Sequence, residues 1–229
     1  MPRESRIIKD RLAVIGNYCQ GKSVLDLGCT DYRPDGNRKY TSTGLHLYLK
    51  DIAASLTGVD VDEEGVEQMR REGFHVVSGD VETLDLDRQF DCVVAGELLE
   101  HLSNPGLFLE NMHRHLKDSG CFILTVPNAF GITSVFRILR RGEIKVHGEH
   151  TCWFDPKTLT TLLVRHGFRV ERLYFFNKRK WYRMRYFYKM KYQVPKFLTW
   201  LRPYFGGNLL VVARKADRSI SKGKMPEER

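Results

Sequence analysis

Two carboxylates and an imidazole occur within five residues in the stretch Glu97-Leu98-Leu99-Glu100-His101. On a helix, residues three and four positions apart share a face, so Glu97, Glu100 and His101 are expected to converge. Such a set suits a divalent cation such as Mg²⁺ or Mn²⁺, and the stretch from His147 to His150 adds a further imidazole. The alternative is metal-free chemistry in which a histidine removes a proton from the substrate.

Three aspartates stand where runs of β-type residues end, namely Asp26, Asp60 and Asp80. Ligands bind open α/β sheets at the carboxyl ends of strands, and a glycine such as Gly28 lets a ligand approach the backbone closely. A carboxylate at the position of Asp60 can accept both hydroxyls of a ribose. The set favours an adenosine compound without phosphate, because a dinucleotide site needs G-x-G-x-x-G and this turn reads G-C-T-D-Y-R.

Short β-type runs alternate with helical patterns along the chain, which predicts a parallel sheet with helices on both faces. The expected strands are Ser23–Leu27, Leu56–Asp60, Phe74–Val77, Phe90–Ala95, Cys121–Val126, Phe168–Phe176 and Asn208–Ala213. The expected helices are Asp62–Arg71, Pro105–Lys117 and Pro156–His166. The last two strands are expected to pair antiparallel, with a helical insertion between them at about 178–205. The predicted organisation is one domain over residues 1–215 and a flexible tail over residues 216–229.

These motifs resemble class I S-adenosylmethionine-dependent methyltransferases, including the type 11 and type 23 groups, over roughly Gly21–Ala213. The matching stretches are VLDLGC, GVDVDEEGVEQM, SGDVETL and the run that begins FDCVVAGELLEHL. The resemblance implies a Rossmann-like seven-stranded sheet in the order 3-2-1-4-5-7-6. It also implies S-adenosylmethionine as cofactor, bound by Asp26, Gly28, Cys29, Asp60, Val61, Asp80, Val81 and Glu97. The chain departs from the family at Thr30, where a glycine is usual.

The E-x-x-E-H stretch is also similar to that of ubiquinone-pathway O-methyltransferases and small-RNA 2′-O-methyltransferases. That similarity implies metal ligands at Glu97, Glu100, His101 and His150, with His147 as a substitute. In the metal-free alternative, His101 and His150 are the catalytic residues. The implied acceptor is a hydroxyl of a small molecule, a glycan or a quinone-like lipid. RNA 2′-O-methylation, N- or C-methylation and a non-catalytic scaffold at membranes remain as alternatives.

The net charge of +9 is concentrated near the end of the chain. Residues 172–216 hold twelve Lys and Arg and no acid, which leaves the rest at −3 (9 − 12). The insertion at 178–205 mixes nine cations with ten aromatic residues. That mixture fits an anionic membrane surface, a nucleic acid or an ordinary cap over the sheet. With no secretory signal and no membrane-spanning run in the sequence, we expect a cytoplasmic protein, associated with membranes only peripherally.

Four further predictions concern the surroundings of the site. Trp153 either walls the acceptor pocket or packs ahead of the helix at Pro156. Residues 130–141 are expected to form a mobile cover. His46 either faces the cofactor or occupies an ordinary position on an amphipathic helix. The five cysteines contain no C-x-x-C pair and are expected to be reduced.

Overall fold

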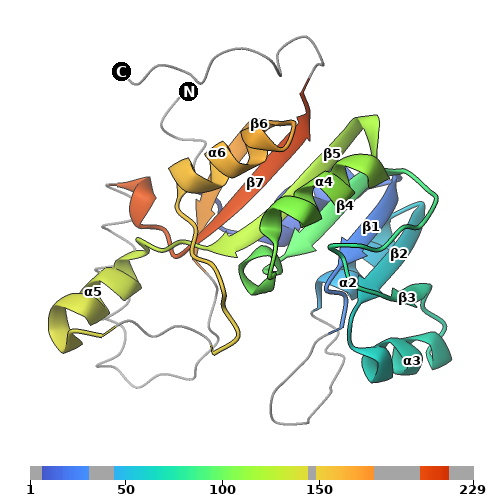
Figure 1. The fold of residues 1–229 in the computed structure, drawn as a ribbon, viewed down its shortest axis with the longest axis horizontal. Helices are drawn as coiled ribbons and strands as arrows, with labels where there is room; N and C mark the ends of the chain where they lie inside the picture. The colour runs from blue at the N-terminus through green and yellow to red at the C-terminus, as the bar shows by residue number, and fades with distance from the viewer. Residues whose placement is uncertain (1–6, 31–43, 144–147, 178–201, 217–229) are drawn as a thin grey trace.

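Seven strands form one sheet in the order β3-β2-β1-β4-β5-β7-β6 (Figure 1). The computed structural model describes residues 7–30, 44–143, 148–177 and 202–216. The strands are β1 (Ser23–Leu27), β2 (Ser55–Asp60), β3 (Val76–Ser78), β4 (Phe90–Gly96), β5 (Leu116–Pro127), β6 (Phe168–Phe176) and β7 (Asn208–Lys215). Neighbours among β1 to β5 pair parallel, and β7 pairs antiparallel with β5 and β6. The parallel strands therefore all end at one side of the sheet, here called the carboxyl edge.

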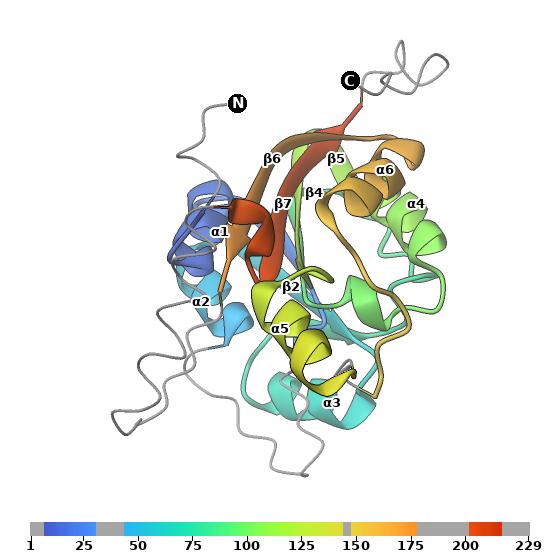
Figure 2. The same ribbon diagram turned by 90° about the vertical axis from the view of Figure 1, so that its left-hand side faces the viewer.

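Apolar side chains of the central strands alternate between the two faces of the sheet, as the pleat requires. In β4, Val93 belongs to one core cluster and Cys92 to the other. Helices α4 (Pro105–His115) and α6 (Pro156–Arg165) cover the first face, while α1 (Arg11–Cys19) and α2 (Leu45–Ile52) cover the second (Figure 2). Burial on both faces explains why these strands read as nearly continuous apolar runs.

Side chains just ahead of α4 and α6 cap the two helices of the first face. The Asn104 carboxamide oxygen accepts a hydrogen bond from the backbone N–H of Leu107 at 3.0 Å, and Pro105 follows at the first helical position. Asp155 and Thr158 form a reciprocal capping box at the start of α6. Both helices therefore begin where the sequence provides a cap.

Four shorter or more peripheral elements complete the described fold. Helix α3 (Glu63–Arg71) packs on β3 through Val66 and Met69, and α5 (Ile132–Arg141) follows β5. Two 3₁₀ helices, η2 (Leu99–His101) and η3 (Pro203–Phe205), lie after β4 and before β7. None of the helices in the described ranges is both long enough and apolar enough to span a bilayer.

The structure confirms the predicted strand order and all seven strands, with differences at the ends. The largest difference is in β5, which begins at Leu116 rather than Cys121. Helix α1 was not predicted, and the segment expected as a cover contains the regular helix α5. The five cysteines are unpaired thiols, as expected. Most of the insertion (178–201) and the tail (217–229) lie outside the described residues.

Candidate functional site

The turn after β1 brings the backbone of the first two strands together at the carboxyl edge. Gly28 has a φ of +72°, in the left-handed region that favours glycine, and its N–H donates to the Val59 carbonyl at 2.8 Å. A β-carbon on Gly28 would stand 3.4 Å from the Leu98 side chain. The glycine therefore permits a tight turn. Because glycine has no side chain, the backbone at this position is not covered by one.

The Asp60 carboxylate holds the start of the loop that follows this turn. One oxygen, Oδ2, accepts from the Thr30 backbone N–H at 2.9 Å and from the Thr30 hydroxyl at 2.8 Å. The other, Oδ1, accepts from the Asp62 N–H at 3.0 Å. The departure from glycine at Thr30 thus supplies a hydroxyl that binds the carboxylate predicted to hold ribose.

Asp26 does not present its carboxylate at the edge, contrary to the expectation of three aligned acids. It is 2% exposed, and its Oδ2 lies 2.9 Å from Nδ1 of His46, which is 5% exposed. A carboxylate at this depth must be paired, because burying an isolated charge is costly. His46 supplies that partner from a buried position on α2, which agrees with the second of the two roles considered for it, a position on an amphipathic helix.

The other predicted cofactor residues differ widely in exposure. Cys29 is buried, and burial, with Asp26 and Asp60 nearby, raises the pKa of its thiol far above the usual range. Val61 is 66% exposed, whereas Val81 is buried. Asp80 is exposed and accepts from the Glu82 N–H at 2.9 Å. Asp80 and Val81 therefore combine an accessible acid with a buried apolar side chain after β3.

Glu97 does not converge with Glu100 and His101, because the segment after β4 is not an α-helix. Glu97 has a φ of +57°, which is uncommon for a residue with a side chain, and only Leu99–His101 form the 3₁₀ helix η2. Its carboxylate instead lies 3.4 Å from the guanidinium of Arg11. Arg11 was missed by sequence reasoning, since nothing in the sequence near it points to β4.

Glu100, His101 and His150 do come together. One ligand atom from each lies within 4.8 Å of the others, and the two imidazole rings are 4.6 Å apart at 88°. Glu100 is 2% exposed, while both histidines are half-buried. This group, here called the Glu–His–His cluster, offers a carboxylate and two imidazoles at the carboxyl edge. His147 lies outside the described residues.

Thr151 explains how His150 reaches His101 across 49 positions of sequence (150 − 101). Its hydroxyl donates to the carbonyls of Glu100 at 3.1 Å and Leu102 at 2.6 Å, and its N–H donates to the Glu100 carbonyl at 2.9 Å. The hydrogen bonds of Thr151 thus hold the segment 148–154 against η2. Sequence reasoning missed Thr151, because only the fold brings η2 within reach of its hydroxyl.

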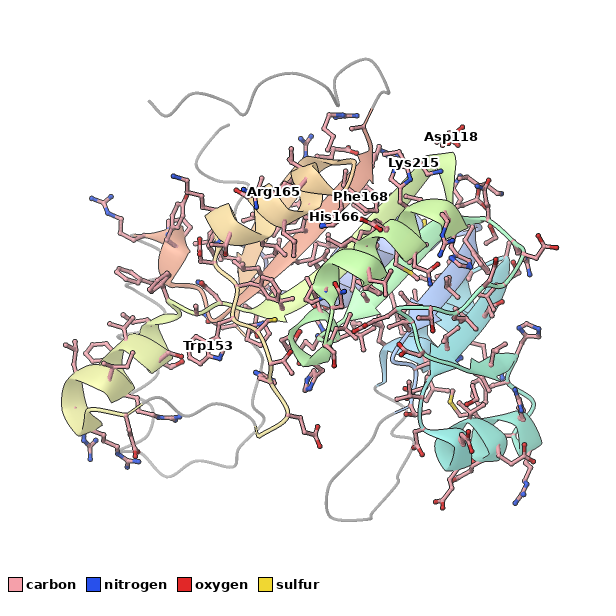
Figure 3. All side chains as sticks on the ribbon, viewed as in Figure 1. Asp118, Trp153, Arg165, His166, Phe168 and Lys215 are labelled. Carbon is pink, nitrogen blue, oxygen red and sulfur yellow. The ribbon has the colours of Figure 1, made fainter. Side chains whose placement is uncertain are left out.

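Of the two neighbouring aromatic residues Trp153 and Phe154, it is Phe154 that packs ahead of α6. Phe154 is 7% exposed and packs in the core with Leu159, so Phe154 is the residue that packs ahead of α6. Trp153 is 39% exposed and lies near the start of α5, since Phe154 pairs with Asn128 (Figure 3). Trp153 therefore does not pack ahead of α6, and its place in an acceptor pocket stays a prediction.

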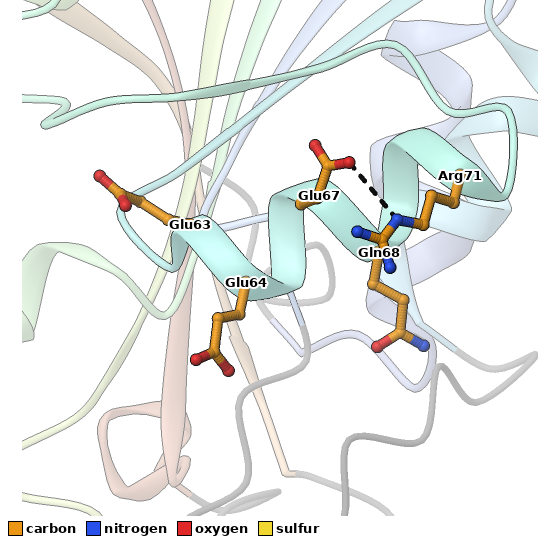
Figure 4. Close-up of a pocket in the computed structure, with 5 residues that line it drawn as sticks. All are labelled: Glu63, Glu64, Glu67, Gln68 and Arg71. Carbon is orange, nitrogen blue, oxygen red and sulfur yellow. Dashed lines mark ion pairs between the residues drawn. The ribbon is translucent and has the colours of Figure 1, made fainter.

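A separate pocket lies along the outer side of α3 (Figure 4). Its lining residues are Glu63, Glu64, Glu67, Gln68 and Arg71, and Glu67 pairs with Arg71 at 3.4 Å. None of the predicted site residues lines it. We therefore place the functional site at the carboxyl edge.

Comparisons with known proteins identify the family of the chain. Residues 3–173 match the family model described as "Methyltransferase domain". A probable S-adenosylmethionine-dependent methyltransferase of Mycolicibacterium smegmatis is 27% identical over 74% of this chain and 59% of its own length. A mitochondrial ubiquinone biosynthesis O-methyltransferase of Rattus norvegicus is 27% identical over 68% of this chain and 47% of its own length. The chain thus spans less than two thirds of either relative.

Among solved structures, a SAM-dependent methyltransferase from Archaeoglobus fulgidus superposes with a TM-score of 0.59 at 22% identity. The match covers 90% of this chain and 91% of the other. That likeness concerns the fold, whereas the family model extends over most of the sequence. The chain therefore belongs to the methyltransferase domain family and has the fold of class I S-adenosylmethionine-dependent methyltransferases.

Proposed function

We propose that this methyltransferase methylates an oxygen atom, namely a hydroxyl of a small molecule, a glycan or a quinone-type lipid. The observation that carries the proposal is the Glu–His–His cluster after β4, beside the turn at Gly28. Its imidazoles, from His101 and His150, are half-buried, and a half-buried imidazole can exchange a proton with a substrate near neutral pH. A hydroxyl needs such a base, because it is a weak nucleophile while protonated.

The residues at the carboxyl edge fit S-adenosylmethionine. Gly28 leaves room for a ligand against the backbone, and Asp60 offers carboxylate oxygens at the end of β2. Val81 supplies an apolar wall and Asp80 an acceptor after β3. The cofactor supplies a methyl group on a positively charged sulfur.

In the proposed step, the imidazole of His101 or His150 accepts the proton of the acceptor hydroxyl. The oxygen then forms a bond to the methyl carbon as the carbon–sulfur bond breaks, and the departing sulfur is neutral. Glu100 lies within 4.8 Å of both histidines and favours the charged imidazolium that results. The name of the rat relative, an O-methyltransferase, supports an oxygen acceptor.

The proposal is tested by methyl transfer from tritium-labelled S-adenosylmethionine into fractionated cell extract. Lipid, small-molecule, glycan and RNA pools are counted separately, and the labelled product is hydrolysed to identify the methylated atom. We expect label on oxygen outside the RNA pool. The variants His101→Ala and His150→Ala should each lose about 10²–10⁴-fold in rate, the usual contribution of a positioned acid or base.

His75→Gln serves as the matched control, since His75 is exposed outside the cluster. Label on nitrogen or carbon would contradict the oxygen assignment. Cofactor binding without transfer into any pool would instead favour a non-catalytic scaffold.

A second candidate is the same O-methylation assisted by a metal ion. The Glu–His–His cluster carries it, because a carboxylate and two imidazoles within 4.8 Å suit a divalent cation such as Mg²⁺ or Mn²⁺. Glu97 is outside this set, so any metal would be held by three side chains rather than the four expected. Under this candidate EDTA abolishes activity, Mg²⁺ or Mn²⁺ restores it, and Glu100→Gln weakens metal binding. Label in RNA would then point to metal-assisted 2′-O-methylation.

A further inference from the structure

Helix α5 stands apart from the helices that cover the sheet (Figure 1). Ile132 at its start is its only buried residue. Val135, Phe136 and Leu139 follow Ile132 at intervals of three, four and seven residues, so they share one face. Phe136 is 46% exposed and Leu139 is 78% exposed. Within the described part of the chain, this apolar face is therefore left largely uncovered.

The polar side of α5 carries three arginines, namely Arg137, Arg140 and Arg141. Arg140 and Arg141 are exposed, and Arg141 lies 3.8 Å from Glu143. An apolar face opposed by a side rich in arginine is the composition of a helix that lies in the headgroup region of a bilayer. We call Phe136, Leu139 and the three arginines the α5 surface.

Asn128 and Asn177 both bind the turn formed by Gly206 and Gly207. The Asn128 carboxamide, just before α5, donates to the Gly206 carbonyl at 2.7 Å, and Asn177 accepts from the Gly207 N–H at 2.9 Å. In the sequence, Asn177 is followed by residues 178–201, which hold eight Lys and Arg and no acid and lie outside the described residues. This composition has the same charge sign as the arginines of α5.

We propose that α5 docks this enzyme onto an anionic lipid surface. Leu139 and the neighbouring Ile138 (40% exposed) favour lipid over nucleic acid, because aliphatic side chains insert among acyl chains but cannot stack on bases. Helix α5 follows the end of β5, so docking turns the carboxyl edge toward the bilayer. The surface goes beyond the proposed O-methylation, since its binding does not depend on which atom is methylated.

The test is vesicle flotation of the full chain without substrate. Neutral phosphatidylcholine vesicles are compared with vesicles containing one part in five of phosphatidylglycerol, at 0.1 M and 0.5 M NaCl. We expect at least tenfold tighter binding to the anionic vesicles, reduced by the higher salt. The pair Phe136→Ser and Leu139→Ser should lose about tenfold for each side chain removed from the bilayer. The pair Arg137→Ala and Arg140→Ala should lose about fivefold for each charge.

Matched controls lie on α6, where Val164 is 52% exposed and Arg165 is labelled in Figure 3. Val164→Ser and Arg165→Ala should bind vesicles within twofold of the parent chain. The altered side chains of the α5 surface are largely exposed, so the thermal unfolding of the α5 variants should match that of the parent chain. Flotation that persists in both α5 variants overturns the proposal, as does a parent chain that binds RNA but no vesicles. Neither result bears on the tritium assay, so the two proposals fail independently.

Discussion

Replacing Asp60 by asparagine tests the cofactor site most directly. A carboxylate offers about four lone-pair positions, and within the described residues three are used, by the Thr30 N–H, the Thr30 hydroxyl and the Asp62 N–H. One position on Oδ1 is left for a ribose hydroxyl. A hydrogen bond to a charged group contributes about 1.5–3 kcal/mol, which corresponds to about 10- to 150-fold in affinity. We therefore expect Asp60→Asn to weaken cofactor binding by a factor in that range.

The measurement is isothermal titration calorimetry with S-adenosylhomocysteine, which avoids turnover. Asp51→Asn is the matched control, because Asp51 lies exposed on α2. Thr30→Val keeps the backbone N–H to Asp60 and should bind within about threefold of the parent chain, since it removes one neutral donor. Binding by Asp60→Asn within twofold of the parent would refute the assignment of Asp60 to the ribose. A melting temperature close to that of the parent excludes loss of fold as the cause.

Of three further predictions, two concern the stability of the fold and one concerns the hydrogen bonds that hold Thr151 against η2. Gly28→Ala should destabilise the fold by about 1–2 kcal/mol in urea denaturation, because its φ is left-handed. The ammonium of Lys117, with Ser23, lowers the pKa of Asp91, so Asp91 stabilises the fold above its unfolded pKa of about 3.9 and loses that contribution as the pH falls further. Asp91→Asn should therefore cost about 1 kcal/mol at pH 7 and flatten the loss of stability below about pH 4 in acid titrations. Thr151→Val should lower kcat by about tenfold with KM for the cofactor unchanged, because His150 loses its anchor; an unchanged kcat would contradict the role of these hydrogen bonds.

Local patterns predicted the sheet well, because each central strand is buried on both faces and each turn carries its own signal. Two helix starts, Pro105 and Pro156, were predicted at the correct residue. Helix α1 escaped prediction, since its Ile15 and Cys19 bury against strands distant in sequence. In such a case, tertiary packing rather than local pattern decides the structure.

The candidate site was predicted less completely than the sheet. Glu100, His101 and His150 were grouped correctly on the basis of a resemblance, whereas the grouping of Glu97 with them was wrong because the expected α-helix is a 3₁₀ turn. The contact of His46 with Asp26 depends on where α2 packs, which no spacing reveals. Side-chain partners between separate elements are properties of the fold and not of the local sequence.

The position of β4 in the middle of the sheet separates two tasks along the chain. Residues that fit the cofactor end before β4, at Val81, and those of the Glu–His–His cluster begin after it, at Glu100. Under the proposed function, we expect substitutions in the later half to alter which acceptor is methylated while the earlier half keeps its ligand. The same division would let such a chain change its acceptor through the second part of its gene alone. Laboratory chimaeras joined within β4 offer a direct route to new acceptor specificity.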